Sequence, residues 1–322
     1  MQVPSRRVIS PTMYVAPTGL VEHAAALREY RTDACGRAYT LPELTEVFIA
    51  HAANWNHLGA TKAWWSVLTG GFKPKSEISR AEQRRFYNTG EAHVARVLRE
   101  LTLRQDVLAA KYGEEHSRPS HSDAVKLEGY HRGRHRTALD FGCGLGRLAF
   151  SFAAQFDRVL CVDQSVQHLR RAREATGALN ASHADRIDFI TSTPDLLAAL
   201  RGRRADVVHS VIALQHMVTP LQAVYFEQLC DALRPGGLGW LHYVSEISGG
   251  AGRAAAGCDL ESSIRGSLEG MQMHALPASD AVRALQRRNC TVWRNLKDPP
   301  APGVPHGKYR NRIVLFGKQS AM

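Results

Sequence analysis

The hydrophobic and polar positions along the chain change their period near residue 137. Over residues 41–111 the apolar residues recur at steps of three and four, which is the period of an amphipathic helix. The stretch 41–55 carries a proline near its first turn, where proline suits a helix start. The stretch 79–110 predicts one or two further helices, with a break at Gly90. The sequence therefore predicts a helical region here.

After residue 137, short apolar runs alternate with amphipathic stretches. The apolar runs predict strands at 137–142, 158–164, 186–191, 205–211, 238–244, 290–296 and 311–318. The amphipathic stretches predict helices at 146–156, 165–177, 194–201, 219–233 and 277–289. Strands that alternate with helices indicate a parallel sheet with helices on both faces. No helix separates the last two runs, so the final strand is expected to return antiparallel.

These patterns together predict an α/β fold. We expect a Rossmann-like sheet of seven strands, its last strand antiparallel, preceded by helices. The polar segment 112–136 separates the two parts and has the composition of a linker or an exposed loop. We therefore expect an N-terminal helical region over residues 1–125 and an α/β domain over residues 126–322.

Composition and charge narrow the class of protein. No run approaches the roughly 18 uncharged apolar residues of a membrane span, and the N-terminus lacks the apolar core of a secretory signal. The six cysteines form no Cys-x-x-Cys pair, so we expect reduced thiols in a cytoplasmic protein rather than disulfides or a zinc site. The net charge of +11 would suit an anionic partner, but the basic residues are dispersed and solvated arginines are the simpler explanation.

A glycine-rich turn follows the first predicted strand, in the sequence "LDFGCGLG" at 139–146. A dinucleotide-binding turn requires a third glycine where Arg147 stands. The carboxylate of Asp140 would also repel a pyrophosphate. At the tip of the second strand, Asp163 can accept hydrogen bonds from ribose hydroxyls, although it could instead only cap a helix. The turn therefore favours a ligand with a ribose, no phosphate and a positive centre, as in S-adenosyl-L-methionine.

Residues 137–318 resemble a class I S-adenosylmethionine-dependent methyltransferase. "ALDFGCGLG" resembles the first motif of that family, "VLCVDQS" the second, and "LRPGG" at 233–237 the turn before the fifth strand. The resemblance implies that the cofactor is bound by Asp140, Gly142, Cys143, Gly144, Gly146, Asp163, Gln164 and Ser192. One departure concerns adenine, because Ser192 and Thr193 stand where many members carry an acid.

His216, in "SVIALQHM" after the fourth strand, is the candidate for chemistry on the methyl acceptor. Its ordinary pKa near 6.5 suits a general base that takes a proton from a hydroxyl. Alternatively, it only packs the loop or lines the cofactor pocket. His51 and His57 lie on different faces of the predicted helix, so we expect no metal pair there.

Two segments are candidate lids. The aromatic stretch at 63–90 is similar to a pattern that precedes the methyltransferase domain in bacterial enzymes, some of them linked to surface-glycan methylation. That similarity implies Trp65, Tyr87 and Gly90 near the cofactor, whereas a packed satellite core would explain the aromatics equally well. A 32-residue insertion at 245–276 would shape the acceptor site.

The resulting functional hypothesis is O-methylation of a hydroxyl on a sugar, a glycan or a related small molecule, with S-adenosyl-L-methionine as cofactor. An anionic acceptor would use the arginine surplus. An RNA or protein methyltransferase is an alternative, although no RNA-binding module is visible. A non-catalytic binding module that retains the fold is another, against which the intact acids and glycines argue. A dehydrogenase is the third, and it would require NAD.

Overall fold

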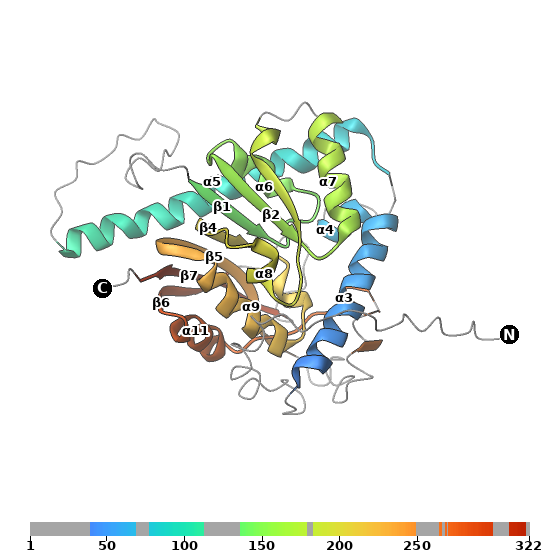
Figure 1. The fold of residues 1–322 in the computed structure, drawn as a ribbon. Helices are drawn as coiled ribbons and strands as arrows, with labels where there is room; N and C mark the ends of the chain where they lie inside the picture. The colour runs from blue at the N-terminus through green and yellow to red at the C-terminus, as the bar shows by residue number, and fades with distance from the viewer. Residues whose placement is uncertain are drawn as a thin grey trace.

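The computed structural model describes residues 39–68, 77–112, 136–178, 183–248, 264–265, 268, 270–298 and 309–319. Its centre is a seven-stranded sheet in the order β3-β2-β1-β4-β5-β7-β6 (Figure 1). The strands are β1 Thr137–Phe141, β2 Arg158–Asp163, β3 Ile187–Thr191, β4 Ala205–Ser210, β5 Leu233–Ile247, β6 Cys290–Lys297 and β7 Tyr309–Lys318. The first five pair in parallel, and β7 is antiparallel to both neighbours. The predicted sheet, with its antiparallel last strand, is confirmed.

Helices cover both faces of the sheet. In the C-terminal part these are α6 Arg147–Ala153, α7 Val166–Ala178, α8 Leu196–Leu200, α9 Thr219–Asp231 and α11 Ala278–Arg287. Alternate residues of one strand face opposite sides, as the twofold period of a strand requires. In β1, Leu139 and Phe141 join the core beneath α9 and α11, whereas Ala138 joins the core beneath α6. Both faces are apolar, and the strands therefore read as continuous apolar runs.

The N-terminal helices are α3 Leu41–Thr61, α4 Ala63–Val67 and α5 Arg80–Tyr112. Thr40 and Glu43 form a capping box that starts α3, and α3 packs against α7 (Figure 1). The predicted break at Gly90 is wrong, because α5 runs through it without interruption. A methyl group at Gly90 would collide with the backbone carbonyl oxygen of Arg147. Glycine stands there because α5 and α6 approach closely.

The expectation of reduced thiols is also wrong for four cysteines. Cys143 pairs with Cys161 and Cys230 with Cys290, with Cα atoms 5.5 and 6.3 Å apart, inside the usual range for a disulfide. The pairs join residues on neighbouring elements, so their spacing along the chain gives no Cys-x-x-Cys signal. Cys35 and Cys258 lie outside the described residues.

Three other sequence-based expectations are resolved only in part. The turn expected at 233–237 belongs to β5, whose pairing with β4 shifts register there. The boundary expected near residue 125 and most of the insertion at 245–276 lie outside the described residues. Within the described part of the chain, no helix is long and apolar enough to cross a membrane.

The close approach of α5 and α6 predicts that Gly90→Ala destabilises the protein. The added methyl group would force the two helices apart, which we expect to lower the free energy of unfolding by about 1–3 kcal/mol. The matched control is Gly177→Ala in α7, where an added methyl group meets no atom within 4 Å. Thermal unfolding should show a lowered melting temperature for the first variant and an equal or raised one for the second. Equal melting temperatures for Gly90→Ala and the wild type would contradict the packing role.

Candidate active site

The glycine turn lies between β1 and α6, next to the point where the strand order reverses. Gly142, Gly144 and Gly146 have φ angles of 73°, 54° and 76°, a region that glycine adopts without steric cost. The space beside two of them is also filled. A side chain at Gly142 would collide with Ala213, and one at Gly144 would come within 2.8 Å of Val67. The alternating glycines are therefore required both by the backbone and by its neighbours.

The backbone N–H groups of this turn are already engaged within the protein. Those of Gly142 and Cys143 donate to the carbonyl oxygen of Val162, at 2.8 and 3.1 Å. The N–H of Gly144 donates to Asp163, and that of Gly146 to the carbonyl of Cys143. A phosphate-binding turn instead presents its N–H groups to the ligand. The geometry thus excludes a phosphate cradle at these four positions.

Asp163, at the end of β2, holds the turn in place. Its Oδ2 accepts a hydrogen bond from the N–H of Gly144 and its Oδ1 one from the N–H of Ser165, both at 2.8 Å. The second bond leads directly into α7. Burial raises the pKa of Asp163 from 3.8 to about 6, and the two backbone hydrogen bonds oppose this rise. The carboxylate therefore organises the backbone and also borders the adjacent cavity.

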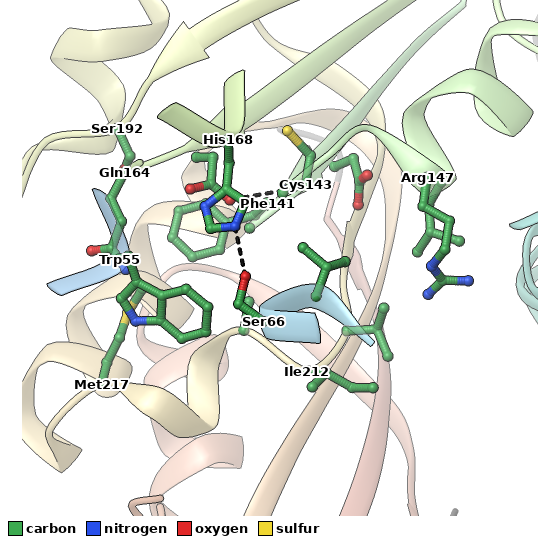
Figure 2. A pocket seen from close by; sticks show the side chains of 18 residues that line it. Trp55, Ser66, Phe141, Cys143, Arg147, Gln164, His168, Ser192, Ile212 and Met217 are labelled. Carbon is green, nitrogen blue, oxygen red and sulfur yellow. Dashed lines mark hydrogen bonds between the residues drawn. The ribbon is translucent and has the colours of Figure 1, made fainter. Parts of the chain in front are cut away.

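A cavity opens at the carboxyl ends of β1, β2 and β4, where open α/β sheets bind their ligands. Seven of the residues expected to contact the cofactor line it: Asp140, Gly142, Cys143, Gly144, Asp163, Gln164 and Ser192. Gly146 does not, and packs against Phe150 instead. Figure 2 shows the residues that surround this cavity.

Sequence reasoning did not assign several of the lining residues to the site. They are Trp55, Ser66, Val67, Phe141, Arg147, Leu148, His168, Val211, Ile212, Ala213 and Met217. The segment 211–213 directly follows β4. Its position at the carboxyl end of a predicted strand could have indicated that it lies at the cavity. Ile212 has a φ of 55°, which is rare for a β-branched residue and marks a constrained backbone at the cavity. The contribution of α3 carried no signal in the local sequence, whereas Ser66 and Val67 of α4 belong to the stretch 63–90 that was expected near the cofactor.

On the α3 side of the cavity, His51 links two lining residues, Trp55 and Gln164, by hydrogen bonds. Trp55 donates from its Nε1 to Nε2 of His51 at 3.0 Å, so the hydrogen of the imidazole lies on Nδ1. This Nδ1 donates to the side-chain oxygen of Gln164, also at 3.0 Å. Burial lowers the pKa of His51 to about 3 and keeps it neutral. Trp55 and Gln164 are thereby fixed side by side at one end of the cavity (Figure 2).

The N-terminal aromatics lie behind the turn rather than at the cavity. Trp65, Tyr87 and Gly90 are not among its lining residues. The Tyr87 hydroxyl donates to the carbonyl of Leu145, and its ring stacks on Phe150 at 4.9 Å between centroids. The satellite core is formed around Trp64 and Phe86, while Trp65 is only partly buried. Tyr87 thus contacts the turn from outside the cavity.

Two charged side chains also line the cavity. Asp140 is 2% exposed and Arg147 is 8% exposed, and both line the cavity. Asp140 Oδ1 accepts a hydrogen bond from Nδ1 of His209 at 2.9 Å. The Nη1 of Arg147 donates to the Thr89 hydroxyl at 3.3 Å. Figure 2 shows Arg147 at the far side of the cavity from Trp55 and Gln164.

His216 lies in the short 3₁₀ helix Leu214–His216 after β4. Its Nδ1 donates to the backbone carbonyl of Gln272 at 2.7 Å, and its ring centroid lies 5.2 Å from that of Trp55. Burial lowers its pKa to about 4. His216 does not itself line the cavity, but the next residue, Met217, does. Within the described residues, no group of three His, Cys, Asp or Glu side chains could hold a metal ion.

The region that contains the glycine turn and the cavity is similar to known proteins. Residues 139–238 match the sequence model of a family described as a methyltransferase domain. No curated protein matches the chain. Magnesium protoporphyrin IX methyltransferase from Synechocystis PCC 6803, solved with bound S-adenosylhomocysteine, aligns over 82% of this chain and 98% of its own, at 14% identity and a TM-score of 0.48. A methyltransferase from Clostridium acetobutylicum ATCC 824 aligns over 58% and 85%, at 12% identity and 0.42.

The family match begins inside β1 and ends inside β5, so it includes the glycine turn and Asp163. The strand order, with β7 inserted antiparallel between β5 and β6, agrees with the fold expected for class I methyltransferases. The chain therefore has the fold of class I methyltransferases, and residues 139–238 of it match a methyltransferase domain.

Proposed function

We propose that this enzyme O-methylates a hydroxyl group of a sugar, a glycan or a related small molecule. The state of His216 is the observation that carries the proposal. Its Nδ1–H is donated to Gln272, which leaves the lone pair of Nε2 available. With its pKa lowered to about 4 by burial, the imidazole is unprotonated at neutral pH, and it is a weaker base than a free histidine. A hydroxyl acceptor requires such a group, because it loses its proton as it is methylated.

The sugar part of the proposal has separate support. The aromatic stretch that packs behind the glycine turn is the one that is similar to bacterial enzymes linked to surface-glycan methylation. The net charge of +11 would suit an acceptor that carries phosphate or carboxylate groups. The alternative hypotheses are an enzyme that methylates RNA or protein, and a non-catalytic binding module that retains the fold.

The cavity fits the cofactor in chemical terms. S-adenosylmethionine, when bound, supplies an electrophilic methyl group on a sulfonium centre. Asp163 and Gln164 would hold the ribose hydroxyls, and Ser192 would border the adenine. Gly142 and Gly144 of the turn, whose N–H groups are occupied and which have no side chain, would lie against the methionine part. We propose these roles on the positions of the residues around one cavity.

A transfer assay tests the proposed acceptor class. The full chain is incubated with S-adenosylmethionine labelled on its methyl group and with separate panels of nucleotide sugars and glycans, RNA, and protein. Mass spectrometry should find the label as an added methyl ether on a carbohydrate hydroxyl. Label in RNA, with binding that weakens steeply as salt rises, would contradict the sugar assignment in favour of RNA. Label confined to protein side chains would also contradict it.

His216→Ala should slow turnover by about 100-fold or more if His216 is the general base. Its affinity for S-adenosylhomocysteine should stay within about twofold of wild type, because the proton transfer serves the acceptor and not the cofactor. The matched control is His57→Ala, an exposed histidine on the same α3 that carries Trp55, and it should keep normal turnover. A loss of only a few fold in His216→Ala would assign His216 to packing.

Cofactor affinity should depend on pH through Asp163. The ionised carboxylate accepts hydrogen bonds from hydroxyls, and its pKa of about 6 means that it protonates as the pH falls from about 7 to about 5. We expect the affinity for S-adenosylhomocysteine to fall about tenfold over this interval, the scale of one lost hydrogen bond to a charged group.

Asp163→Asn should bind more weakly and lose this pH dependence. The control Asp188→Asn changes an acid that pairs with Arg158, and should keep the wild-type profile. Calorimetric titration at several pH values measures all three proteins. An unchanged pH profile in Asp163→Asn would refute the ribose role of this carboxylate.

A further inference from the structure

One of the two disulfides lies at the candidate cofactor site. Cys143 belongs to the glycine turn and lines the cavity, while its partner Cys161 lies inside β2, two residues before Asp163. The other disulfide joins Cys230 near the end of α9 to Cys290 at the start of β6, and neither of these residues lines the cavity. A covalent bond therefore ties the turn to the neighbouring strand at the border of the cavity.

The Cys143–Cys161 disulfide is packed behind the turn. Both cysteines belong to the core that contains Leu148 and Phe152 of α6. Cys161 is fully buried, and Cys143 is 5% exposed. Figure 2 shows the sulfur of Cys143 directed away from Ile212, another residue that lines the cavity. Protein interiors are close-packed, so two sulfur atoms that are no longer bonded cannot move apart here unless a neighbouring segment shifts.

The turn is the segment that can shift. β2 pairs with β1 on one side and with β3 on the other, so Cys161 is held from both sides. The turn is held by individual hydrogen bonds, such as those from Gly142 and Cys143 to the carbonyl oxygen of Val162. When the sulfur of Cys143 moves away from that of Cys161, it therefore carries the turn toward the cavity.

Two lining residues lie directly against the turn on that side. A methyl group on Gly142 would collide with Ala213, and one on Gly144 would come within 2.8 Å of Val67. Ala213 and Val67 both line the cavity. A shift of the turn thus pushes on the segment after β4 and on α4, and it changes the shape of the cavity.

We propose that the Cys143–Cys161 pair is a redox switch for cofactor binding. The disulfide holds the turn in the form that binds the ligand, and its reduction weakens binding. The proposal rests on S-adenosylmethionine as the proposed cofactor. It requires reciprocal coupling, because a ligand that binds the disulfide form more tightly also stabilises that disulfide against reduction.

The reductant is a low-molecular-weight thiol. Its thiolate attacks the sulfur of Cys143, the more exposed of the pair, and Cys161 leaves as a thiolate that takes up a proton. A second thiol then attacks the mixed disulfide and releases Cys143. Two reductant thiols are thereby oxidised to one disulfide, and two cysteine thiols form in the protein. The reverse exchange restores the protein disulfide, so the surrounding ratio of thiol to disulfide sets the state of the pair.

The closing experiment measures the redox state of each disulfide on the full chain. The protein is equilibrated in graded ratios of reduced to oxidised dithiothreitol, with and without saturating S-adenosylhomocysteine. Free thiols are then alkylated and assigned to each cysteine by mass spectrometry. The ligand should make the Cys143–Cys161 pair about tenfold harder to reduce, a shift of about 30 mV to lower potential. The Cys230–Cys290 pair is the internal control and should not shift.

Calorimetric titration gives the reciprocal measurement. The reduced protein should bind S-adenosylhomocysteine about tenfold more weakly than the oxidised protein, the same factor as in the redox equilibrium. Cys161→Ala leaves room behind the turn for the side chain of Cys143, so its affinity should no longer depend on the redox state. The matched control Cys230→Ala removes the other disulfide and should keep the full dependence. Thermal unfolding shows that each variant is folded, and the wild-type measurements decide even where a variant is not.

The contrary outcomes are distinct. Reduction of the Cys143–Cys161 pair without a change in ligand affinity would assign this disulfide to stability alone and overturn the switch. A pair that resists reduction until the protein unfolds would overturn it too, as would loss of the redox response in Cys230→Ala. A protein that binds S-adenosylhomocysteine in neither redox state would refute the cofactor assignment itself, and this failure is distinguishable because no ligand is bound in either state.

Discussion

The two hydrogen bonds accepted by the Asp163 carboxylate hold the cofactor site together. One fixes Gly144 in the turn after β1, and the other fixes Ser165 at the entry to α7. Together with the N–H groups of Gly142 and Cys143, which bond to the end of β2, they close the turn onto the neighbouring strand. The turn and Asp163 thereby line the same cavity.

This closure also determines which ligands fit. The N–H groups of the turn donate hydrogen bonds within the protein, so they are not available to a phosphate. Side chains that line the cavity must therefore select the ligand. Asp163 at one place and Asp140 with Arg147 at another provide charges of both signs along the same cavity. This pattern supports the proposed ligand, which has a ribose, a positive centre and no phosphate. The hydrogen bonds within the turn thus support the proposed cofactor, which carries no phosphate.

Much of the fold could be predicted, because strand and helix periods are local properties. The strands, the antiparallel return and the glycine turn are of this kind. The uninterrupted α5 and the cysteine pairs could not be predicted, because the role of Gly90 depends on the approach of α6 and the pairs join neighbouring elements. Trp55 and Arg147 were missed for the same reason. Their roles depend on burial and on partners far along the chain, which a local pattern does not contain.

The role of the N-terminal helices α3, α4 and α5 was the hardest to predict from the sequence. The aromatic pattern predicted a lid over the cofactor. Ser66 and Val67 from that stretch line the cavity, whereas Tyr87 contacts the turn at Leu145. The most direct test of the account is a calorimetric titration of the wild-type protein with S-adenosylhomocysteine and, separately, with NAD⁺. We predict saturable one-to-one binding of S-adenosylhomocysteine and none of NAD⁺. Binding of NAD⁺ without binding of S-adenosylhomocysteine would contradict the account.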